Sequence, residues 1–432
     1  MERKNTNYAM EKQSMNIDNK LDRLHTALTE CTRYYKESLP LCAAENVISA
    51  FAKIPLDGDF QERYIMGSPY SYKLEGNFIG SDKLLPFYSM IHDECQLLFG
   101  AHYADARTLS GMNCLTTLLM SVTSAKDRIA ILPPEWGGHP SVQPVCERLG
   151  LQVFPLPYCH TKWDIDYDRA NHLLRQEKIK YILVAPSDII RPLSVEHFDL
   201  TDCVLLYDIS QLMGLMAGGV IECPIGLKNT VIFGGTHKTL PGPASGLILT
   251  NDERLHLQIE QNINPTFLRH TQMHQVISLL FSLLETESYG AEYAVAIVDT
   301  ANQLGNHLAQ HGFQLGKTLK GFSETHQLFI CCSLEEMLRI NQNAIQNGIT
   351  LNKKEKSLFA GNGIRLGTQE IARYGWSGQA LSTISDILAM LRQDVPDKAR
   401  IKKLKESLPP KTVQYTFPLA VQEKLLSTLH QK

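Results

Sequence analysis

The sequence predicts an α/β protein, with a large domain built on a mostly parallel (mixed) sheet flanked by helices and a smaller C-terminal α/β domain. Short apolar runs that end in turn or polar residues predict the strands, and amphipathic segments between them predict the helices. Such uniformly apolar strands are typical of a sheet that is buried on both faces. The functional loops are therefore expected at the carboxyl ends of the strands.

Helices are expected before the strands and between them. In residues 17–39, leucine and tyrosine side chains recur at helix-like intervals. One amphipathic helix is expected to end at Gly100, and another is expected to begin behind the Ser110–Gly111 pair. Further helices are expected at 140–150, at 168–178 and over a long stretch from about 266 to 310.

Six short apolar runs are expected to form the large sheet, at 128–134, 152–158, 181–187, 203–209, 230–236 and 246–252. The smaller unit is expected to have strands near 326–332 and 362–368, helices at 334–348 and 377–393, and then a polar tail. This pattern divides the chain into an N-terminal helical arm (1–60), a large domain (61–300) and a small C-terminal domain (301–432).

The composition is that of an ordinary globular protein, with 44% hydrophobic residues, 20% charged residues and a net charge of −3. No basic stripe is present, so no nucleic acid partner is expected. Residues 1–20 do not resemble a signal peptide or anchor, and the most apolar helical run, 276–284, is too short to span a bilayer, so no membrane association is expected. The ten cysteines form no CxxC pair, and adjacent Cys331 and Cys332 are expected in a buried strand. We therefore expect a reduced, cytoplasmic protein without a metal site.

The stretch "FGGTHKTLPGPASG" (233–246) sets Lys238 among glycine, threonine and proline. A phosphate loop does not explain it, because that motif needs a glycine where this chain has His237. Asp208 directly follows an apolar strand, where a charge is costly unless it is paired. "SGMN" (110–113) opens a helix whose N–H groups could hold an anion.

These three features together predict a site for pyridoxal phosphate (PLP). Lys238 would form a Schiff base with the cofactor aldehyde, and Asp208 would pair with the protonated pyridine nitrogen. The helix N-terminus would take the phosphate, with the Thr236 hydroxyl close by. A desolvated lysine beside a cationic ring becomes a usable amine, which explains the surroundings of Lys238.

The chain resembles the serine hydroxymethyltransferases and their threonine aldolase and transaldolase relatives, which are PLP enzymes of fold type I. The matching stretches are "LCAAEN" (41–46), "FGAHYADARTLSGMN" (99–113), "PEWGGH" (134–139), "YDISQLMGLMAGG" (207–219), "GGTHKTLPGPASG" (234–246) and "GNGIRLGTQEI" (361–371). They cover most of the chain in the family's order. The resemblance therefore implies a fold type I PLP enzyme that is a divergent member of this group.

The resemblance also implies the cofactor contacts. Lys238 is expected to be the Schiff-base lysine, and Asp208 the pyridinium partner. Ser110, Gly111 and Thr236 are expected to hold the phosphate. The full set of expected cofactor contacts is Ser110, Gly111, Met112, Trp136, Ser187, Asp208, Gln211, Thr236, His237 and Lys238.

Further roles are implied for catalysis and substrate binding. Trp136 stands where the family places an aromatic residue, usually histidine, stacked on the cofactor ring; a core tryptophan is the alternative. His139 matches a second histidine and is either catalytic or a loop residue. Arg365 matches the arginine that binds the substrate α-carboxylate, and Ser187 a serine near the cofactor O3′ side that is also expected to contact substrate. Tyr64 matches a substrate-binding tyrosine from the second subunit, which implies a homodimer with shared active sites.

The chain departs from the family where folate is used. Met66 replaces a glutamate that the family needs for folate-dependent one-carbon transfer, and methionine can neither accept nor donate a proton. Glu75 is a candidate substitute base, and a solvated loop glutamate is the alternative.

Other departures lie around the expected site. Ala44, Gln211 and Ala244 replace a serine, a histidine and an arginine of the family. The family's glycine-rich, phosphate-facing loop corresponds to 264–274, where Arg269 is a candidate phosphate contact.

The leading hypothesis for function is Cα–Cβ chemistry on a small β-hydroxy amino acid or on glycine, through a glycyl quinonoid and without tetrahydrofolate. This is the reaction of threonine aldolases and transaldolases, with amino acid and aldehyde substrates. The alternative is another PLP reaction at Cα: transamination, decarboxylation, racemisation or β/γ-substitution. A non-catalytic dimeric scaffold is a third hypothesis, which the lysine and aspartate argue against.

Overall fold

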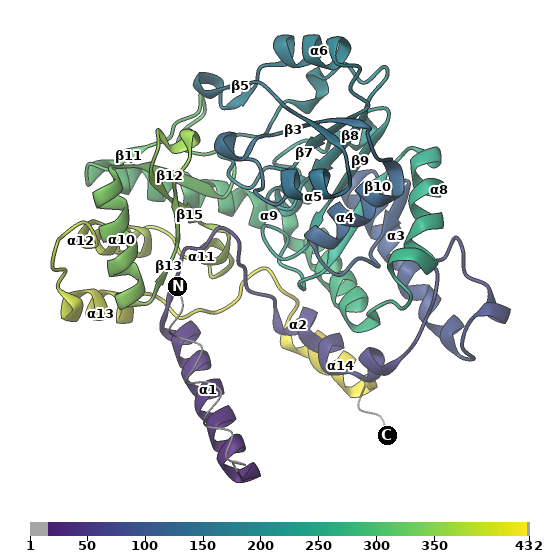
Figure 1. Cartoon of the computed structure of the whole chain (residues 1–432). Coiled ribbons are helices and arrows are strands. Elements are labelled where there is room, and N and C mark those ends of the chain that lie inside the picture. The colour runs from purple at the N-terminus through teal and green to yellow at the C-terminus, as the bar shows by residue number, and fades with distance from the viewer. Residues whose placement is uncertain (1–15, 430–432) are drawn as a thin grey trace.

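A seven-stranded sheet is the centre of the large domain in the computed structural model, which describes residues 16–429 (Figure 1). All of its strands run parallel except β10, which is antiparallel to both neighbours. The spatial order of the strands is β2 (Tyr103–Asp105), β10 (Gly246–Thr250), β9 (Thr230–Gly235), β8 (Val204–Asp208), β7 (Tyr181–Val184), β3 (Arg128–Ile131) and β4 (Gln152–Pro155). The predicted mostly parallel, mixed sheet and all six of its predicted strands are confirmed.

Helices cover both faces of this sheet, because successive side chains of each strand point to opposite sides. Leu205 packs into a core with α3 and α9, whereas its neighbour Leu206 packs into a second core with α4 and α8. The predicted end of α3 at Gly100 is confirmed, with a left-handed φ of 72° there. The helices are α3 (Leu85–Phe99), α4 (Gly111–Val122), α5 (Val142–Arg148), α6 (Tyr167–Gln176), α7 (Met213–Ala217), α8 (Glu253–Asn262) and α9 (Met273–Gln310).

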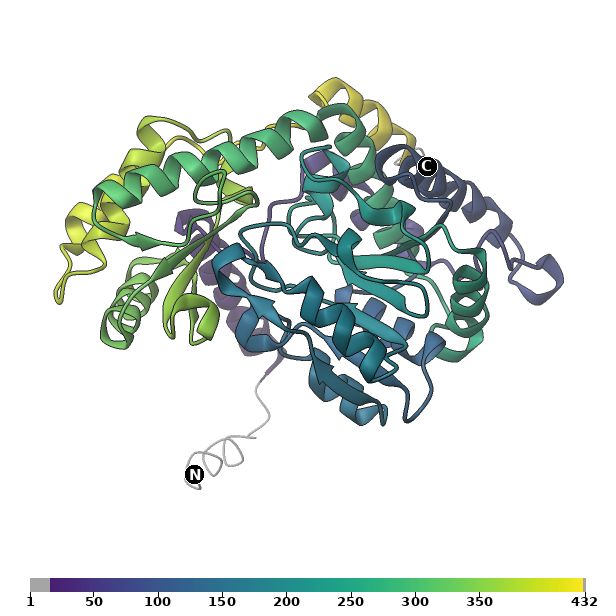
Figure 2. The same ribbon diagram turned by 90° about the horizontal axis from the view of Figure 1, so that it is seen from above.

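The long helix α9 joins the two domains and contributes to the core of each (Figure 2). Ile297 belongs to the core of the large domain, and Ala301 to that of the small domain. The core to which α9 contributes therefore changes between these two residues. The helix begins at Met273 rather than near 266, because Leu268 has extended backbone and separates it from a short helical turn at Ile263–Phe267.

The small domain packs helices against a four-stranded antiparallel sheet, in the order β11 (Gln314–Leu315), β12 (Gln327–Cys331), β15 (Gly363–Gly367) and β14 (Asn352–Lys354). Its helices are α10 (Leu334–Asn347), α11 (Gln369–Arg373), α12 (Gln379–Met390) and α13 (Lys398–Glu406). The predicted polar tail contains two helices. Ile401 anchors α13 in the core, and α14 (Leu419–Leu429) follows.

The N-terminal arm begins with α1 (Ile17–Glu37), as the leucine spacing predicts, and residues 1–15 lie outside the described chain. No residue of α1 is buried, and its side chains Leu21, Leu24 and Leu28 are 54–59% exposed. Figure 1 shows α1, in purple, projecting from the body of the molecule. The chain then enters the small domain, where β1 (Leu39–Pro40) pairs with β13 (Ile349–Thr350), before α2 (Ala50–Lys53).

Within residues 16–429, no helix combines the length and the apolar character that crossing a bilayer requires. A two-stranded ribbon of β5 (Tyr158–Cys159) and β6 (Asp164–Ile165) extends beyond the sheet, close to the first strands of the small domain (Figure 1). All ten cysteines are free, as expected for a reduced protein. Cys331 and Cys332 lie at the end of β12 and are half-buried.

Candidate active site

The predicted lysine, aspartate and helix N-terminus meet at the carboxyl ends of β8 and β9. Asp208 is the last residue of β8 and is in register with Phe233 of β9, the strand that leads to Lys238. The first turn of α4 lies against the end of β9, since a Cβ on Gly111 would approach the Gly235 nitrogen to 2.8 Å. A residue larger than glycine would therefore push this helix away from the strand.

Ser210, a residue that we did not predict, fixes the Asp208 carboxylate. Its hydroxyl and its backbone N–H donate to Asp208 Oδ1 over 2.5 and 2.8 Å. The same hydroxyl accepts a hydrogen bond from the Gly235 N–H over 2.8 Å. Ser210 therefore couples the carboxylate on β8 to the end of β9 and leaves Oδ2 without a serine contact.

Lys238 is largely enclosed, and its backbone is held from the N-terminal segment. Burial lowers the pKa of Lys238; Asp208 opposes this shift, and Arg365 adds to it. The Asn46 side chain donates to the Lys238 carbonyl oxygen over 2.5 Å and to the Tyr293 hydroxyl over 2.9 Å. The lysine thus has the desolvated surroundings that its sequence context predicts.

Two of the hydroxyls expected to hold phosphate already have partners within the chain. Ser110 caps α4 by accepting from the Asn113 N–H at 3.1 Å. Thr236 is buried and donates to the Pro243 carbonyl oxygen at 2.7 Å. The N–H groups of the first turn of α4, Gly111 and Met112 included, have no acceptor within the helix and suit an anion.

His237 adds a second donor beside this helix end. Its Nδ1 atom is buried and has no hydrogen-bond partner among residues 16–429. Its ring lies near the close approach of β9 and α4, because a Cβ on Gly235 would be 3.2 Å from His237 Cε1. Burial, together with Lys238, lowers the pKa of His237. An unpaired buried nitrogen next to a helix N-terminus fits a phosphate group.

The structure distinguishes the two aromatic residues of "PEWGGH". Burial lowers the pKa of His139. The negative charge of Asp208 opposes this shift, and the positive charges of Lys238, Lys356 and Lys354 add to it. The charges of the site therefore act on His139. The other residue, Trp136, lines a pocket together with Asp188.

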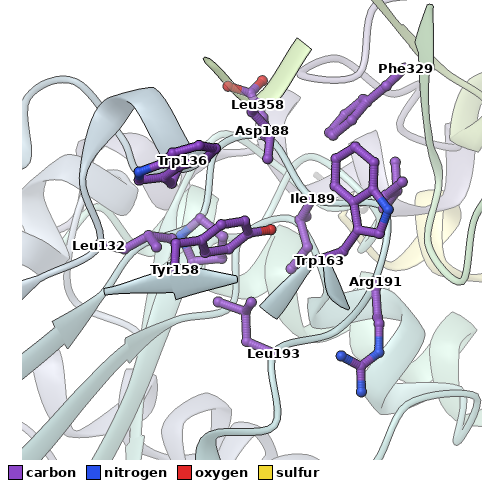
Figure 3. Close-up of a pocket in the computed structure, with 12 residues that line it drawn as sticks. Leu132, Trp136, Tyr158, Trp163, Asp188, Ile189, Arg191, Leu193, Phe329 and Leu358 are labelled. Atoms are coloured by element: carbon purple, nitrogen blue, oxygen red, sulfur yellow. The ribbon is translucent and has the colours of Figure 1, made fainter. Parts of the chain in front are cut away.

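The Trp136 ring stacks on Tyr158, with centroids 5.4 Å apart and planes 14° apart. It lines a narrow pocket with Tyr158, Trp163 and Phe329, and Figure 3 shows its ring turned toward Tyr158. The Trp136 ring thus already has a stacking partner within the chain.

Arg365 reaches the site from β15 and is anchored on the loop after β7. Its Nη1 donates to the Ser187 carbonyl oxygen at 2.7 Å and to Asp188 Oδ1 at 2.9 Å, and its Nη2 donates to Asn352 Oδ1 at 2.8 Å. Its Nε has no partner among the described residues, although Arg365 is only 4% exposed. The arginine thus keeps one donor available to a ligand.

Asp188 is a further residue that the sequence reasoning missed. Lys354 and Lys356 also contact it, at 2.7 and 2.6 Å. Burial by itself would raise the pKa of Asp188, but Arg365 and the two lysines outweigh it and hold the pKa below its usual value. Asp188 follows β7 as Asp208 ends β8, so the same strand-end pattern could have identified it.

Gln211 and Gln327 connect this loop to the small domain. Gln327 Nε2 donates to Gln211 Oε1 at 3.0 Å and to the Ser187 carbonyl oxygen at 3.1 Å. The neighbouring His326 is fully buried, with Nε2 3.1 Å from the Ala43 carbonyl oxygen, and burial lowers its pKa to about 3. His326 is therefore a neutral positioning residue.

The segment around Tyr64 and Met66 contacts residues outside the group formed by Lys238 and Asp208. Tyr64 stacks on His270 at 4.1 Å, and the Met66 backbone is paired with the Asn77 side chain at 3.0 and 2.8 Å. These contacts do not involve Lys238 or Asp208. Within one chain, Tyr64 is thus separate from the site that the other predicted residues form.

Glu75 and Arg269 are the candidates to take over functions of family residues that this chain lacks. Glu75 and Arg269 are exposed, as is Ala244, and Ala44 is half-buried next to "LCAAEN" residues that reach Lys238. The structure therefore brings neither Glu75 nor Arg269 to the charges around Lys238.

A strand-end lysine and aspartate beside an anion-binding helix N-terminus define a PLP-dependent enzyme of fold type I. The chain belongs to the serine hydroxymethyltransferase family, whose profile matches residues 17–388. It is 27% identical over 384 residues to serine hydroxymethyltransferase of Staphylothermus marinus, covering 85% of this chain and 86% of that protein. It is 29% identical over 396 residues to the Picrophilus torridus enzyme, covering 86% and 90%.

The fold agrees with that of a solved relative. L-Threonine transaldolase from Pseudomonas fluorescens superposes with a TM-score of 0.87 at 24% identity, covering 96% of this chain and 98% of that one. The predicted fold, PLP as the cofactor and an enzyme that acts at Cα–Cβ are confirmed by this family membership.

Proposed function

We propose that this enzyme cleaves and forms the Cα–Cβ bond of small β-hydroxy amino acids, in an aldolase or transaldolase reaction, without tetrahydrofolate. The proposal that tetrahydrofolate is not used rests on Met66, which occupies the position where the family has a proton-transferring glutamate. Losing such a group costs on the order of a hundredfold to ten-thousandfold in rate. The residues around Lys238, by contrast, remain suited to the cofactor.

Bound PLP would supply an electron sink for a carbanion at Cα. In our proposal Lys238 carries the cofactor, and Asp208, fixed by Ser210, faces the ring nitrogen and keeps it protonated. The first turn of α4 and His237 hold the phosphate. Trp136 keeps the stacking role that the sequence resemblance gave it, and His139 is a second candidate, because the charges of Asp208 and Lys238 both act on its pKa.

Arg365 would orient the substrate through its α-carboxylate. Its free Nε and its fixed guanidinium plane suit a carboxylate, and the hydrogen bonds to Ser187 and Asp188 hold that plane in place. Burial lowers the pKa of Lys238, which favours the neutral amine that can accept and return a proton. Burial also favours the neutral form of His139, which can accept a proton.

We further propose a homodimer in which Tyr64 enters the site of the partner subunit. Supporting this are the exposed leucines of α1, the exposed Phe78 that packs on Tyr64, and the exposed Ile79 that follows it. Apolar patches of this kind mark interaction surfaces. We place the enzyme in the cytoplasm, which fits its ten free cysteines.

Product analysis tests the proposed reaction. The PLP-loaded enzyme is incubated with L-threonine in the absence of folate, and glycine and acetaldehyde are quantified. Equal amounts of the two products are expected, with none from Lys238→Ala. An oxo acid without glycine would indicate transamination, and carbon dioxide release would indicate decarboxylation; either result would replace the proposed reaction.

A further inference from the structure

Three cations surround one buried carboxylate at the edge of the site. Arg365, Lys354 and Lys356 contact Asp188 at 2.9, 2.7 and 2.6 Å. The side chain of Asp188 is 0% exposed and those of Arg365, Lys354 and Lys356 are 5%, 15% and 16% exposed. Three positive charges against one negative charge leave two positive charges uncompensated in a largely desolvated cluster.

Such an excess of charge is costly, since buried charges need partners. The cost is visible at Lys354, whose pKa is lowered to about 8 by burial first and by Arg365 next. Lys353, the neighbouring residue on β14, differs: its side chain is 45% exposed and its ammonium group pairs with Glu355 at 3.0 Å. The excess charge is therefore specific to the side chains that point toward Asp188.

The cluster is directed toward the catalytic groups. Lys356 Nζ lies 3.4 Å from the carbonyl oxygen of Gly138, the residue before His139. Lys354 and Lys356 both act on the charge state of His139, and Asp188 and Arg365 act on that of Lys238. Lys356 thus lies beside the segment that carries His139, and Arg365 links the cluster to the loop after β7.

We propose that the substrate of this enzyme carries a second carboxylate, on its side chain, which Lys354 and Lys356 bind while Arg365 binds the α-carboxylate. This inference rests on the proposed function of the site. The charge balance indicates the class of substrate. An α-carboxylate neutralises one of the two uncompensated charges, and a side-chain carboxylate neutralises the other. A phosphate dianion would overcompensate the cluster.

The second carboxylate would belong to the part of the substrate that leaves as aldehyde. In the cleavage, the β-hydroxyl loses its proton, the Cα–Cβ electron pair stays on Cα, and Cα then takes a proton to give glycine. The group on Cβ becomes the substituent of the aldehyde, so the same two lysines serve cleavage and synthesis. For 3-hydroxyaspartate the balanced products are glycine and glyoxylate.

Binding of L-aspartate and L-asparagine to the PLP-loaded enzyme tests the proposal, because the two differ by one charge at equal size. Dissociation constants are measured from the absorbance change of the bound cofactor. Aspartate is expected to bind at least about tenfold more tightly than asparagine. In the double variant Lys354→Met/Lys356→Met this preference should vanish while asparagine binds as before. Lys353→Met is the matched control and should keep the preference.

Two results would overturn the proposal. Equal affinities in the wild type would show that no side-chain carboxylate is recognised, and weaker binding of both amino acids in the double variant would assign the lysines to the α-carboxylate or to structure. Tighter binding of O-phosphoserine than of aspartate would also contradict it, since the ligand class would then be a phosphate.

Failure of the proposed function gives a different pattern. Aspartate and asparagine lack a β-hydroxyl and only bind, so their affinities do not depend on Cα–Cβ cleavage. If neither threonine nor 3-hydroxyaspartate is cleaved and aspartate is still preferred through Lys354 and Lys356, the reaction is wrong and the recognition of a second carboxylate stands.

Discussion

The hydroxyl of Ser210 hydrogen-bonds both to the Asp208 carboxylate and to the Gly235 N–H, at 2.5 and 2.8 Å. It therefore joins the ends of β8 and β9, the two strands that deliver Asp208 and Lys238. A single buried side chain fixes the distance between the charge expected at the cofactor ring and the strand that leads to the lysine.

Replacing this hydroxyl should reduce catalysis more than stability. Ser210→Ala removes hydrogen bonds to an ionised group, and we expect kcat/KM for amino acid cleavage to fall about tenfold or more. Steady-state kinetics at saturating PLP check this. The control is Ser121→Ala, since Ser121 is also buried but its hydroxyl has no partner within residues 16–429. Equal kinetics for the two variants would remove Ser210 from the site.

The close approach of α4 to β9 should tolerate no side chain at Gly111. In Gly111→Ala the added Cβ would meet the backbone nitrogen of Gly235 at 2.8 Å and push back the helix end that we assign to phosphate. We expect at least about tenfold weaker PLP binding and a loss of about 1–3 kcal/mol in unfolding free energy. Absorbance titration and urea unfolding measure the two effects.

Gly226→Ala is the control for this variant, because a Cβ there meets nothing within 4 Å. Unchanged PLP affinity in Gly111→Ala would mean that the phosphate lies elsewhere.

Tetrahydrofolate should not accelerate this enzyme. Because Met66 cannot exchange a proton, we expect serine conversion to glycine to be unchanged by added folate, within about twofold. Glycine formation from serine and from threonine is followed with and without the folate. Stimulation of serine conversion by a hundredfold would show that another group replaces the glutamate and would restore the family's usual reaction.

Acid should destabilise the protein through His326. Its pKa is lowered from 6.5 to about 3 by burial, so below about pH 6.5 the unfolded chain binds a proton that the folded chain does not. Stability is thus fully present above the unfolded pKa and is lost as the pH falls toward about 3. From pH 7 to 5 we expect this histidine alone to cost about 2 kcal/mol of unfolding free energy.

Urea unfolding at the two pH values, compared with His326→Gln, isolates this contribution. Glutamine can still donate to the Ala43 carbonyl oxygen but does not titrate. An equal loss in both proteins would assign the acid sensitivity to other groups.

Local signals allowed much of the fold to be predicted from the sequence. Gly100 ends α3 and Ser110 caps α4, because each acts within its own turn of backbone. Asp208 and Lys238 were also visible, since a charge directly after a buried strand has few structural uses. These signals need no knowledge of the tertiary structure.

The missed site residues depend on contacts between distant segments. Asp188 follows a strand of the large domain, while Lys354 and Lys356 come from the small domain, and only the packing of the two domains brings them together. The Ser210 hydroxyl reaches both Asp208 and Gly235 because of the register between β8 and β9. Neither relationship is written in any short stretch of sequence.

The sequence resemblance gave the stacking role to Trp136 and left His139 as either a catalytic or a loop residue. Gly137 lies between them. Its φ of 98° turns the chain, and its carbonyl oxygen accepts the Ser187 and Asp188 N–H groups at 2.7 and 3.0 Å. The Trp136 ring before this turn stacks on Tyr158, and only the packing of distant segments makes that contact.

The identity of the lysine that carries the cofactor is the most direct test. The PLP-loaded enzyme is reduced with borohydride, which fixes the cofactor on its lysine, and the modified peptide is located by mass spectrometry. We expect the mass of the reduced cofactor on Lys238 and on no other lysine, and no modified peptide from Lys238→Ala. Modification of Lys354 or Lys356, or of any lysine outside the ends of β8 and β9, would contradict the assignment of this site.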